Sequence, residues 1–534
     1  MKRNISKIFL GLCCSASVLM TGCIEETFPT DVATEDQLAS SKKATEARLW
    51  AMPAVLNKLG TVSSDYHYDW GYGSIMHIRD VMTEDMAVIS SGYDWYTSWA
   101  ENKDQGESYV YGQFIWNYYW KAVQTTNNLI AAINPEEADE TQIGYLGAAH
   151  AFRALFYLEM AQMYEFLEND KISSINASGN NVLGLTVPIV KEGMTEDETR
   201  NNPRVNRETM ATFILDDLNK AEQYIPNLTS DSKILPHLDA VYGLKARYYM
   251  WLADYAKAKE FSGKAITESG MSPMNEEACL SITKGFNDIS KWMWGSQMLA
   301  EDDVVKTGIV NWASWMSNEA QFGYAAAEPN IMIGANLYNR ISDTDFRKKL
   351  WKAPAGTAMD GKTTYIDANF ANKYLSVYAS VKFRPAEGNC DDYTVGAATA
   401  YPIMRVEEMY FIQAEAAAHL GEDATLLNNF MTTYRDPEYN CTLSGDDLVE
   451  EVVFQKRIEL WGEGLTFFDV KRLNMSVTRG YSGTNFGETK TFNTNGRPAW
   501  MNFCIVQSEK NNNSALIGFE NPDPTDAYIP WSGK

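Results

Sequence analysis

Residues 237–266, HLDAVYGLKARYYMWLADYAKAKEFSGKAI, decide the fold. Apolar residues recur every three or four positions over 240–251, which predicts an amphipathic helix. Asp254 is typical of a helix N-cap, and the same spacing returns over 258–265. The missing side chain of Gly243 allows a neighbouring helix to approach closely. The stretch therefore predicts two helices joined by a short turn.

Further helical segments lie on both sides of this pair. The predicted ranges are 117–133, 144–167, 404–420 and 426–434. Residues 144–167 are apolar on most sides, so we expect that helix to be buried between neighbours. Another helix is expected after Ser444, where Asp447 stands at the spacing of a capping box.

Three long stretches between the helices show no helical spacing. They cover 61–113, 270–400 and 475–534 and are rich in Gly, Asn, Asp, Ser, Tyr and Trp. Loops this long inside a compact protein tend to be functional. The sequence predicts a mostly α fold, a scaffold of tetratricopeptide-like helical pairs with long loop insertions and a few short strands, such as one over 292–298.

The N-terminus is typical of an exported lipoprotein. Lys2 and Arg3 precede an apolar stretch over 8–20, and Gly22 stands just before Cys23. A positive start, a short apolar core and small residues at the cut describe a cleaved signal peptide. We expect residues 1–22 to be removed, Cys23 to carry lipid and 23–40 to form a tether. An ordinary secretory peptide with an incidental Cys is the alternative, whereas the apolar stretch is too short for a spanning helix.

Charge and cysteine content narrow the possible partners. The chain carries a formal net charge of −24, and removal of the cations Lys2, Arg3 and Lys7 brings it to −27. Such a body repels polyphosphate, which argues against nucleic acid as a partner. After removal of the signal peptide and lipidation of Cys23, four cysteines remain, and none belongs to a CxxC pair. Zinc is therefore not expected, while disulfides and buried free thiols both stay open.

Five sequence blocks, in this order behind the lipidation signal, resemble the SusD/RagB family of outer-membrane lipoproteins from Bacteroidetes. They are WNYYWKAVQTTNNLI (116–130), AAHAFRALFYLEMAQMY (148–164), DDLNKAEQYIP (216–226), MRVEEMYFIQAEAAA (404–418) and FQKRIELWGEGLTFFDVKRLN (454–474). The last block departs from the family pattern, because Lys456 stands where Glu is usual and Thr466 where Arg is usual.

The resemblance implies both a domain plan and a function. An N-terminal helical region with aromatic loops would cover 41–270, and a loop-rich C-terminal region, with helices around 404–472, would cover 271–534. Members of the family sit on the extracellular face of the outer membrane. They cap a SusC-like TonB-dependent transporter and deliver oligosaccharides to it, or peptides in the RagB branch. Glu25 and Glu26 are similar to the acidic surface-export tag of such lipoproteins.

Aromatic loops carry the candidate binding site. Residues 66–72 read YHYDWGY and residues 93–99 read YDWYTSW. Sugar rings stack their apolar C–H faces on Trp or Tyr, while polar side chains bond the hydroxyls. In relatives, this loop region and a later one supply aromatic platforms. The candidate ligand-binding residues are Tyr68, Trp70, Arg79, Tyr93, Asp94, Trp95, Tyr96, Trp99, Asn102, Trp312, Trp315 and Tyr324. The alternative is that these aromatics only anchor long loops to the helices.

Catalysis is not predicted. Glu459 and Glu463 stand four residues apart, and two carboxylates could suggest a surface glycoside hydrolase. We instead expect Arg457 and Arg472 to neutralise the acids of this segment in a fixed network, with Asp469 beside Arg472.

Other catalytic and cofactor motifs are weak or missing. The sequence lacks HExxH and GxSxG motifs, and the P-loop-like GTAMDGKT at 356–363 lacks a flanking strand and helix. No cofactor is expected, although Asn389, Asp391 and Asp392 offer oxygen atoms of the kind that calcium binds.

Overall fold

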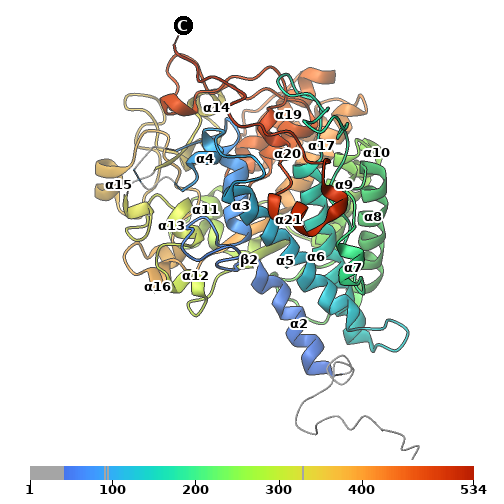
Figure 1. The fold of residues 1–534 in the computed structure, drawn as a ribbon. Coiled ribbons are helices and arrows are strands. Elements are labelled where there is room, and N and C mark those ends of the chain that lie inside the picture. Colours follow the sequence, from blue (N-terminus) through green and yellow to red (C-terminus); the bar gives the residue numbers. More distant parts are fainter. Residues whose placement is uncertain (1–40, 89–91, 93–94, 328–329, 534) are drawn as a thin grey trace, which may run out of the picture.

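A computed structural model describes residues 41–88, 92, 95–327 and 330–533. The predicted signal peptide, Cys23, the tether and the candidate residues Tyr93 and Asp94 lie outside the described residues. Long helices pack side by side in one part of the molecule, and loops with short helices fill the other (Figure 1). The expectation of a mostly α fold with long loop insertions is confirmed. None of the helices in the described part of the chain combines the length and apolarity that a membrane span needs.

The longer helices form the stack. They are α2 (Lys42–Val55), α3 (Tyr72–Val81), α5 (Val110–Ala131), α6 (Glu140–Tyr164), α8 (Arg207–Tyr224), α9 (Leu238–Trp251), α10 (Tyr255–Ser269), α17 (Val406–His419), α18 (Thr425–Tyr434) and α19 (Gly445–Glu459). The shorter ones are α4 (Thr97–Ala100), α7 (Glu196–Thr199), α11 (Glu276–Leu280), α12 (Asp303–Lys306), α13 (Trp312–Met316), α14 (Ala335–Arg340), α15 (Ala368–Tyr374), α16 (Tyr393–Gly396), α20 (Thr466–Arg472) and α21 (Gln507–Asn512).

The pair α9 and α10 forms as its sequence predicts. Asp254 caps α10, because its side chain accepts a hydrogen bond of 3.2 Å from the backbone N–H of Lys257. A Cβ atom at Gly243 would collide with the sulfur of Met404, so glycine lets α9 approach that residue without a shift of the methionine side chain. α10 packs on both α9 and α17, and α17 packs in turn on α19. Helical pairs are thus stacked side by side, as in a tetratricopeptide array.

Several element boundaries differ from the predicted ones. α5 begins at Val110, inside a stretch predicted to be irregular. Met404 lies in a strand rather than a helix, because residues 400–404 pair with the strand at 294–297. Ser444 makes no capping hydrogen bond, so the predicted capping box is wrong. The chain enters α19 through Gly445 at a φ of +59°, a left-handed conformation that favours glycine.

Two small antiparallel sheets tie the loop-rich part together. β1 (Met86–Val88) pairs with β3 (Ile331–Ile333), and β2 (Trp294–Gln297) pairs with β4 (Ala400–Met404). β2 lies inside the predicted strand over 292–298. Both sheets join segments more than 100 residues apart. They therefore hold the loops in fixed positions relative to the helices.

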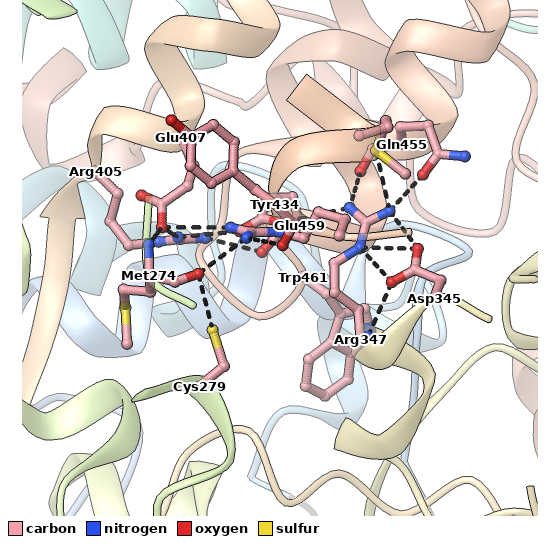
Figure 2. Close-up of polar contacts among 12 residues, drawn as sticks. Met274, Cys279, Asp345, Arg347, Arg405, Glu407, Tyr434, Gln455, Glu459 and Trp461 are labelled. Atoms are coloured by element: carbon pink, nitrogen blue, oxygen red, sulfur yellow. Dashed lines mark hydrogen bonds and ion pairs between the residues drawn. The ribbon is translucent and has the colours of Figure 1, made fainter. Parts of the chain in front are cut away.

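A buried carboxylate, Glu459 at the end of α19, joins four elements. It accepts from Arg435, at the end of α18, over 2.7 Å. It also lies 3.1 Å from Arg405, which precedes α17 (Figure 2). Arg347, from the short helix at 346–350, approaches within 3.3 Å. Burial alone would raise the pKa of Glu459, but the arginines, Arg435 foremost, hold that pKa well below its usual range. Glu459 is therefore a fixed negative charge inside a ring of cations.

Neighbouring acids of the same segment are paired as well. Glu463 accepts from Lys382 over 2.6 Å and from Arg405 over 2.9 Å. Arg472 lies 2.7 Å from Asp469, as predicted. Arg457 was expected to neutralise this group but instead pairs with Glu84 and Asp85 near β1. The cations that face Glu459 and Glu463 come from distant parts of the chain, so helical spacing could not reveal them.

The four cysteines of the described chain are free thiols. Cys279, Cys390, Cys441 and Cys504 are all buried and unpaired. Burial raises the pKa of the Cys279 and Cys390 thiols to about 12, which keeps both protonated at neutral pH. The fold is thus held by packing and ion pairs, without disulfide support among these residues.

Replacing Glu459 by Gln should destabilise the protein strongly. The change leaves three buried arginines short of their shared partner, and breaking a buried pair in this way costs about 3–5 kcal/mol. Glu260→Gln is the matched control, because the Glu260–Lys264 pair is exposed on α10 and contributes about 0.5 kcal/mol or less. Urea unfolding at pH 7 measures both.

The stability that Glu459 contributes should depend on pH. The low pKa of Glu459 in the folded state stabilises the protein above the ordinary carboxyl pKa, and this contribution is lost as pH falls. The gap between wild type and Glu459→Gln should therefore narrow in acid. Equal unfolding midpoints for Glu459→Gln and Glu260→Gln at pH 7 would contradict this role for Glu459.

Candidate functional site

Two aromatic loops meet a third one at the surface of the loop-rich part. Trp95 donates its indole N–H to the hydroxyl of Tyr324 over 2.6 Å, and His67 Nδ1 contacts the same hydroxyl. Tyr324 stacks on Trp315, with ring centroids 4.0 Å apart. The His67 ring lies 4.8 Å from that of Trp95. We call these four residues, together with Tyr66, the aromatic cluster.

A buried aspartate decides which aromatics of the first loop face outward. Asp69 accepts hydrogen bonds from the backbone N–H groups of Thr61 and Val62, at 2.8 and 2.6 Å, and so closes a tight loop. In this conformation Tyr66 and His67 are partly exposed. Sequence reasoning missed these two residues and chose Tyr68 and Trp70, which face the core. The Asp69 contacts set the direction of each side chain, and the sequence gives no sign of them.

Most predicted aromatics lie below the surface. Trp70 donates to the Tyr96 hydroxyl over 2.8 Å, and its ring meets the Trp312 ring edge to face. Tyr68 packs in the same way against Trp99, with centroids 5.2 Å apart. All five side chains are buried. They form the support on which the outer rings rest. The contacts of these five residues therefore agree with the alternative that they anchor the loops.

Trp95 is the predicted aromatic that reaches solvent in the described residues. It is partly exposed, whereas Trp315 and Tyr324 are each 7% exposed. Those two residues nevertheless touch the outer rings directly. The structure therefore brings together Trp95, Trp315 and Tyr324 from the predicted set. Whether they bind a ligand stays a prediction.

The two predicted polar residues in the described chain lie away from the cluster surface. Arg79 is fully buried, 3.1 Å from Glu159 and 4.7 Å above the Phe468 ring. Asn102 is buried too and donates to the backbone carbonyl of Pro524 over 2.7 Å. Both side chains are thus held inside the protein, by the ion pair of Arg79 and by the hydrogen bond that Asn102 donates.

A small cavity of about 20 Å³, lined mostly by apolar side chains, lies behind the cluster and has room for about one water molecule. His77 Nδ1, Thr97 Oγ1 and Trp315 Nε1 border it, and each is buried without a hydrogen-bond partner among the described residues. Burial lowers the pKa of His77 to about 3, so its ring is neutral and can accept a hydrogen bond. The cavity therefore offers both donors and an acceptor to one hydroxyl-sized group.

The possible calcium and nucleotide motifs form ordinary turns. Asn389 Oδ1 accepts from the backbone N–H groups of Asp391 and Asp392, at 3.2 and 2.9 Å. Gly356 donates its backbone N–H to Asp360 over 2.9 Å within the P-loop-like stretch. No group of three His, Cys, Asp or Glu side chains suited to a metal occurs in the part of the chain with described coordinates.

Two sequence profiles match the chain, and together they cover most of it. The profile described as SusD family matches residues 352–522. The profile described as starch-binding associating with outer membrane matches residues 36–250. The chain belongs to the SusD family. All five sequence blocks of this SusD-like protein lie within the two matched ranges.

Solved structures share the fold over nearly the whole chain. A SusD-like carbohydrate binding protein from Bacteroides vulgatus is 21% identical and aligns over 90% of this chain and 98% of its own, with a TM-score of 0.70. A SusD superfamily protein from Bacteroides thetaiotaomicron is 19% identical, covers 89% and 98%, and has a TM-score of 0.65.

A surface glycan-binding protein A from Bacteroides uniformis shares the fold as well, at 16% identity, 90% and 99% coverage and a TM-score of 0.61. At these identities the likeness concerns the fold alone. No curated protein matches the sequence.

Tyr324→Phe should loosen the aromatic cluster. The change removes the hydroxyl that Trp95 and His67 share, and a lost hydrogen bond of this kind costs about 1 kcal/mol of unfolding free energy. Burial lowers the pKa of His67, so its ring is neutral at pH 7 and can accept from that hydroxyl. Urea unfolding of Tyr324→Phe, with Tyr374→Phe at an exposed position as control, measures the loss.

The pH dependence of this effect follows from His67. The hydrogen bond should contribute above the ordinary histidine pKa and be lost as pH falls through the lowered pKa. The difference between wild type and Tyr324→Phe should therefore shrink in acid. A Tyr324→Phe protein as stable as wild type at pH 7 would rule out the shared hydrogen bond.

Proposed function

We propose that this SusD-like protein captures oligosaccharide at the outer surface of the cell and delivers it to a SusC-like TonB-dependent transporter. The observation that carries the proposal is the aromatic cluster, in which Trp95 is both partly exposed and held in place. Its indole N–H bonds Tyr324, and Tyr324 stacks on buried Trp315. An aromatic ring fixed before binding loses little entropy when a ligand arrives.

The chemistry of the cluster suits a sugar. The faces of Trp95, His67 and Tyr66 offer flat apolar surface for the C–H side of a pyranose ring. A hydroxyl group or a bridging water molecule would satisfy the polar atoms around the small cavity behind them, where His77 accepts and Trp315 donates. Stacking and hydroxyl recognition then act side by side.

The state of the acidic residues favours binding over hydrolysis. A retaining glycosidase needs two carboxyl groups about 5 Å apart on either side of a sugar. Glu459 and Glu463 are each buried and bonded to two or more cations, which leaves neither free to act as acid or nucleophile. We therefore infer a carrier without hydrolytic activity.

Membrane attachment through Cys23 completes the proposal. The lipidated cysteine and a tether over 23–40 would hold the protein at the outer membrane by its N-terminus. The tether would lead into α2, which lies at one end of the helical stack (Figure 1). Acyl chains add about 0.8 kcal/mol per buried methylene, so several chains give a stable anchor.

Trp95→Ala should weaken glycan binding. Loss of one stacking ring costs about 1.5 kcal/mol, roughly tenfold in Kd. Binding of neutral oligosaccharides, identified first on a glycan array, is measured by calorimetry. Phe519→Ala removes an exposed aromatic elsewhere and should leave Kd unchanged. Unchanged affinity in Trp95→Ala would remove this residue from the site, and reproducible release of reducing ends from the bound glycan would favour a hydrolase.

Cys23→Ala should release the protein from membranes. Without the thiol there is no attachment point for diacylglycerol, so the protein should move from the membrane pellet to the soluble fraction. The matched control is Cys279→Ala, which removes a buried thiol and should leave the protein in the pellet. Membrane pelleting of Cys23→Ala would contradict the anchor.

A further inference from the structure

A cationic hollow lies on the helical part of the molecule, along α5. One cavity of about 690 Å³ lies between α5 and the loop that contains residues 190–194. A second of about 760 Å³ lies between α5 and α2. The two share Lys58, Lys121, Asn128 and Ala131 in their walls, so they form one continuous depression. We call it the lysine hollow.

Helical spacing builds the walls of the lysine hollow. Asn117, Lys121, Gln124 and Asn128 recur every three or four residues and so share one face of α5. Small side chains on α2 and at the end of α5 form the floor, which is why two packed helices leave space there. They are Ala51, Ala54, Ala131 and Ala132.

The charge of the hollow is opposite to that of the protein. Arg48, Lys58, Lys121 and Lys191 line it, and none of them forms an ion pair with any residue in the described ranges. The single carboxylate in its walls, Glu192, is already paired with Arg153. The chain as a whole carries a net charge of −24. Four cations without acidic partners are thus concentrated in one concave place on an acidic body.

An aromatic ring and several amides accompany the cations. Trp120 is partly exposed in the wall, and its inner edge is held by the Trp116 ring at 5.4 Å and the Tyr157 ring at 6.2 Å. Gln124 and Asn128 bring amide C=O and NH2 groups to the same face, whereas the amide of Asn117 is already bonded to Gln113 and Thr61. A flat apolar ring, neutral hydrogen-bonding groups and ammonium groups therefore face one space.

We propose that the lysine hollow binds a carboxylated saccharide, an oligosaccharide that contains uronic acid residues. The ammonium groups of Lys58 and Lys121 would pair with carboxylates, Trp120 would stack on a ring face, and the amides would bond hydroxyls. The two cavities of the hollow, about 690 and 760 Å³, each fall in the range of small-ligand sites, which favours a short oligosaccharide over a protein surface. The site is separate from the aromatic cluster, with which it shares no residue.

The test uses the full-length protein and a matched pair of ligands. Trigalacturonic acid is titrated in a calorimeter beside the same trisaccharide after reduction of its carboxyl groups. The acid should bind, the neutral analogue should bind at least about fivefold more weakly, and added salt should weaken binding of the acid. Failure of trigalacturonic acid to bind, or equal binding of the neutral analogue, would overturn the proposal.

Two double variants locate the binding. Lys58→Gln with Lys121→Gln should weaken binding of trigalacturonic acid at least about fivefold. Lys257→Gln with Lys264→Gln removes the same charge from exposed positions on α10 and should have no effect. If both pairs act equally, binding follows overall charge and the hollow is not the site.

Two further arms separate this proposal from the proposed function and from a peptide ligand. Trp95→Ala should leave the affinity for trigalacturonic acid unchanged. If Trp95→Ala loses that affinity while the Lys58 and Lys121 double variant keeps it, the acid binds at the aromatic cluster and not in the hollow. Triglutamate should bind more weakly than trigalacturonic acid. Equal or tighter binding of triglutamate would show that the hollow recognises acidic peptides and would refute the saccharide assignment.

Discussion

The ring of arginines around Glu459 is the constraint on which the rest of the structure depends. One carboxylate, at the end of α19, contacts arginines at the start of α17, at the end of α18 and in the short helix before Trp351. Each of these cations lost its water on folding, a cost of several kcal/mol that only close pairing offsets. An arrangement with one contact displaced would leave buried charge unpaired. The helices that meet at Glu459 therefore have a single favourable register.

That fixed core allows the surface to be built from loops. Arg457, two residues before Glu459, pairs with Asp85 next to β1, and β1 pairs with β3 shortly after the loop that carries Tyr324. The aromatic loops are thus connected to the charged core through one strand pair. Long loops that are held in this way can present Trp95 in a fixed orientation, which a free loop could not do without loss of entropy on binding.

Local spacing predicted the helical scaffold well and the site only in part. The pair α9 and α10, the cap at Asp254 and the strand at 294–297 follow from rules that act within about ten residues. The start of α5 and the strand over 400–404 depend on partners far away in the chain, so spacing missed them. The same holds for the aromatics. Composition marked the loops correctly, but contacts of Asp69 with the backbone at 61–62 turn Tyr66 and His67 outward and Tyr68 inward.

The division between buried and exposed aromatics also explains why these loops contain so many of them. A single exposed indole needs a rigid base, and here the base is made of rings: Tyr324 on Trp315, and Trp315 against Tyr96 at 4.8 Å. Each ring contributes apolar area to the core and at the same time restricts the ring above it. Anchoring and binding are therefore not competing explanations for the cluster. The buried rings do the first, and they hold Trp95 in place for the binding that we propose.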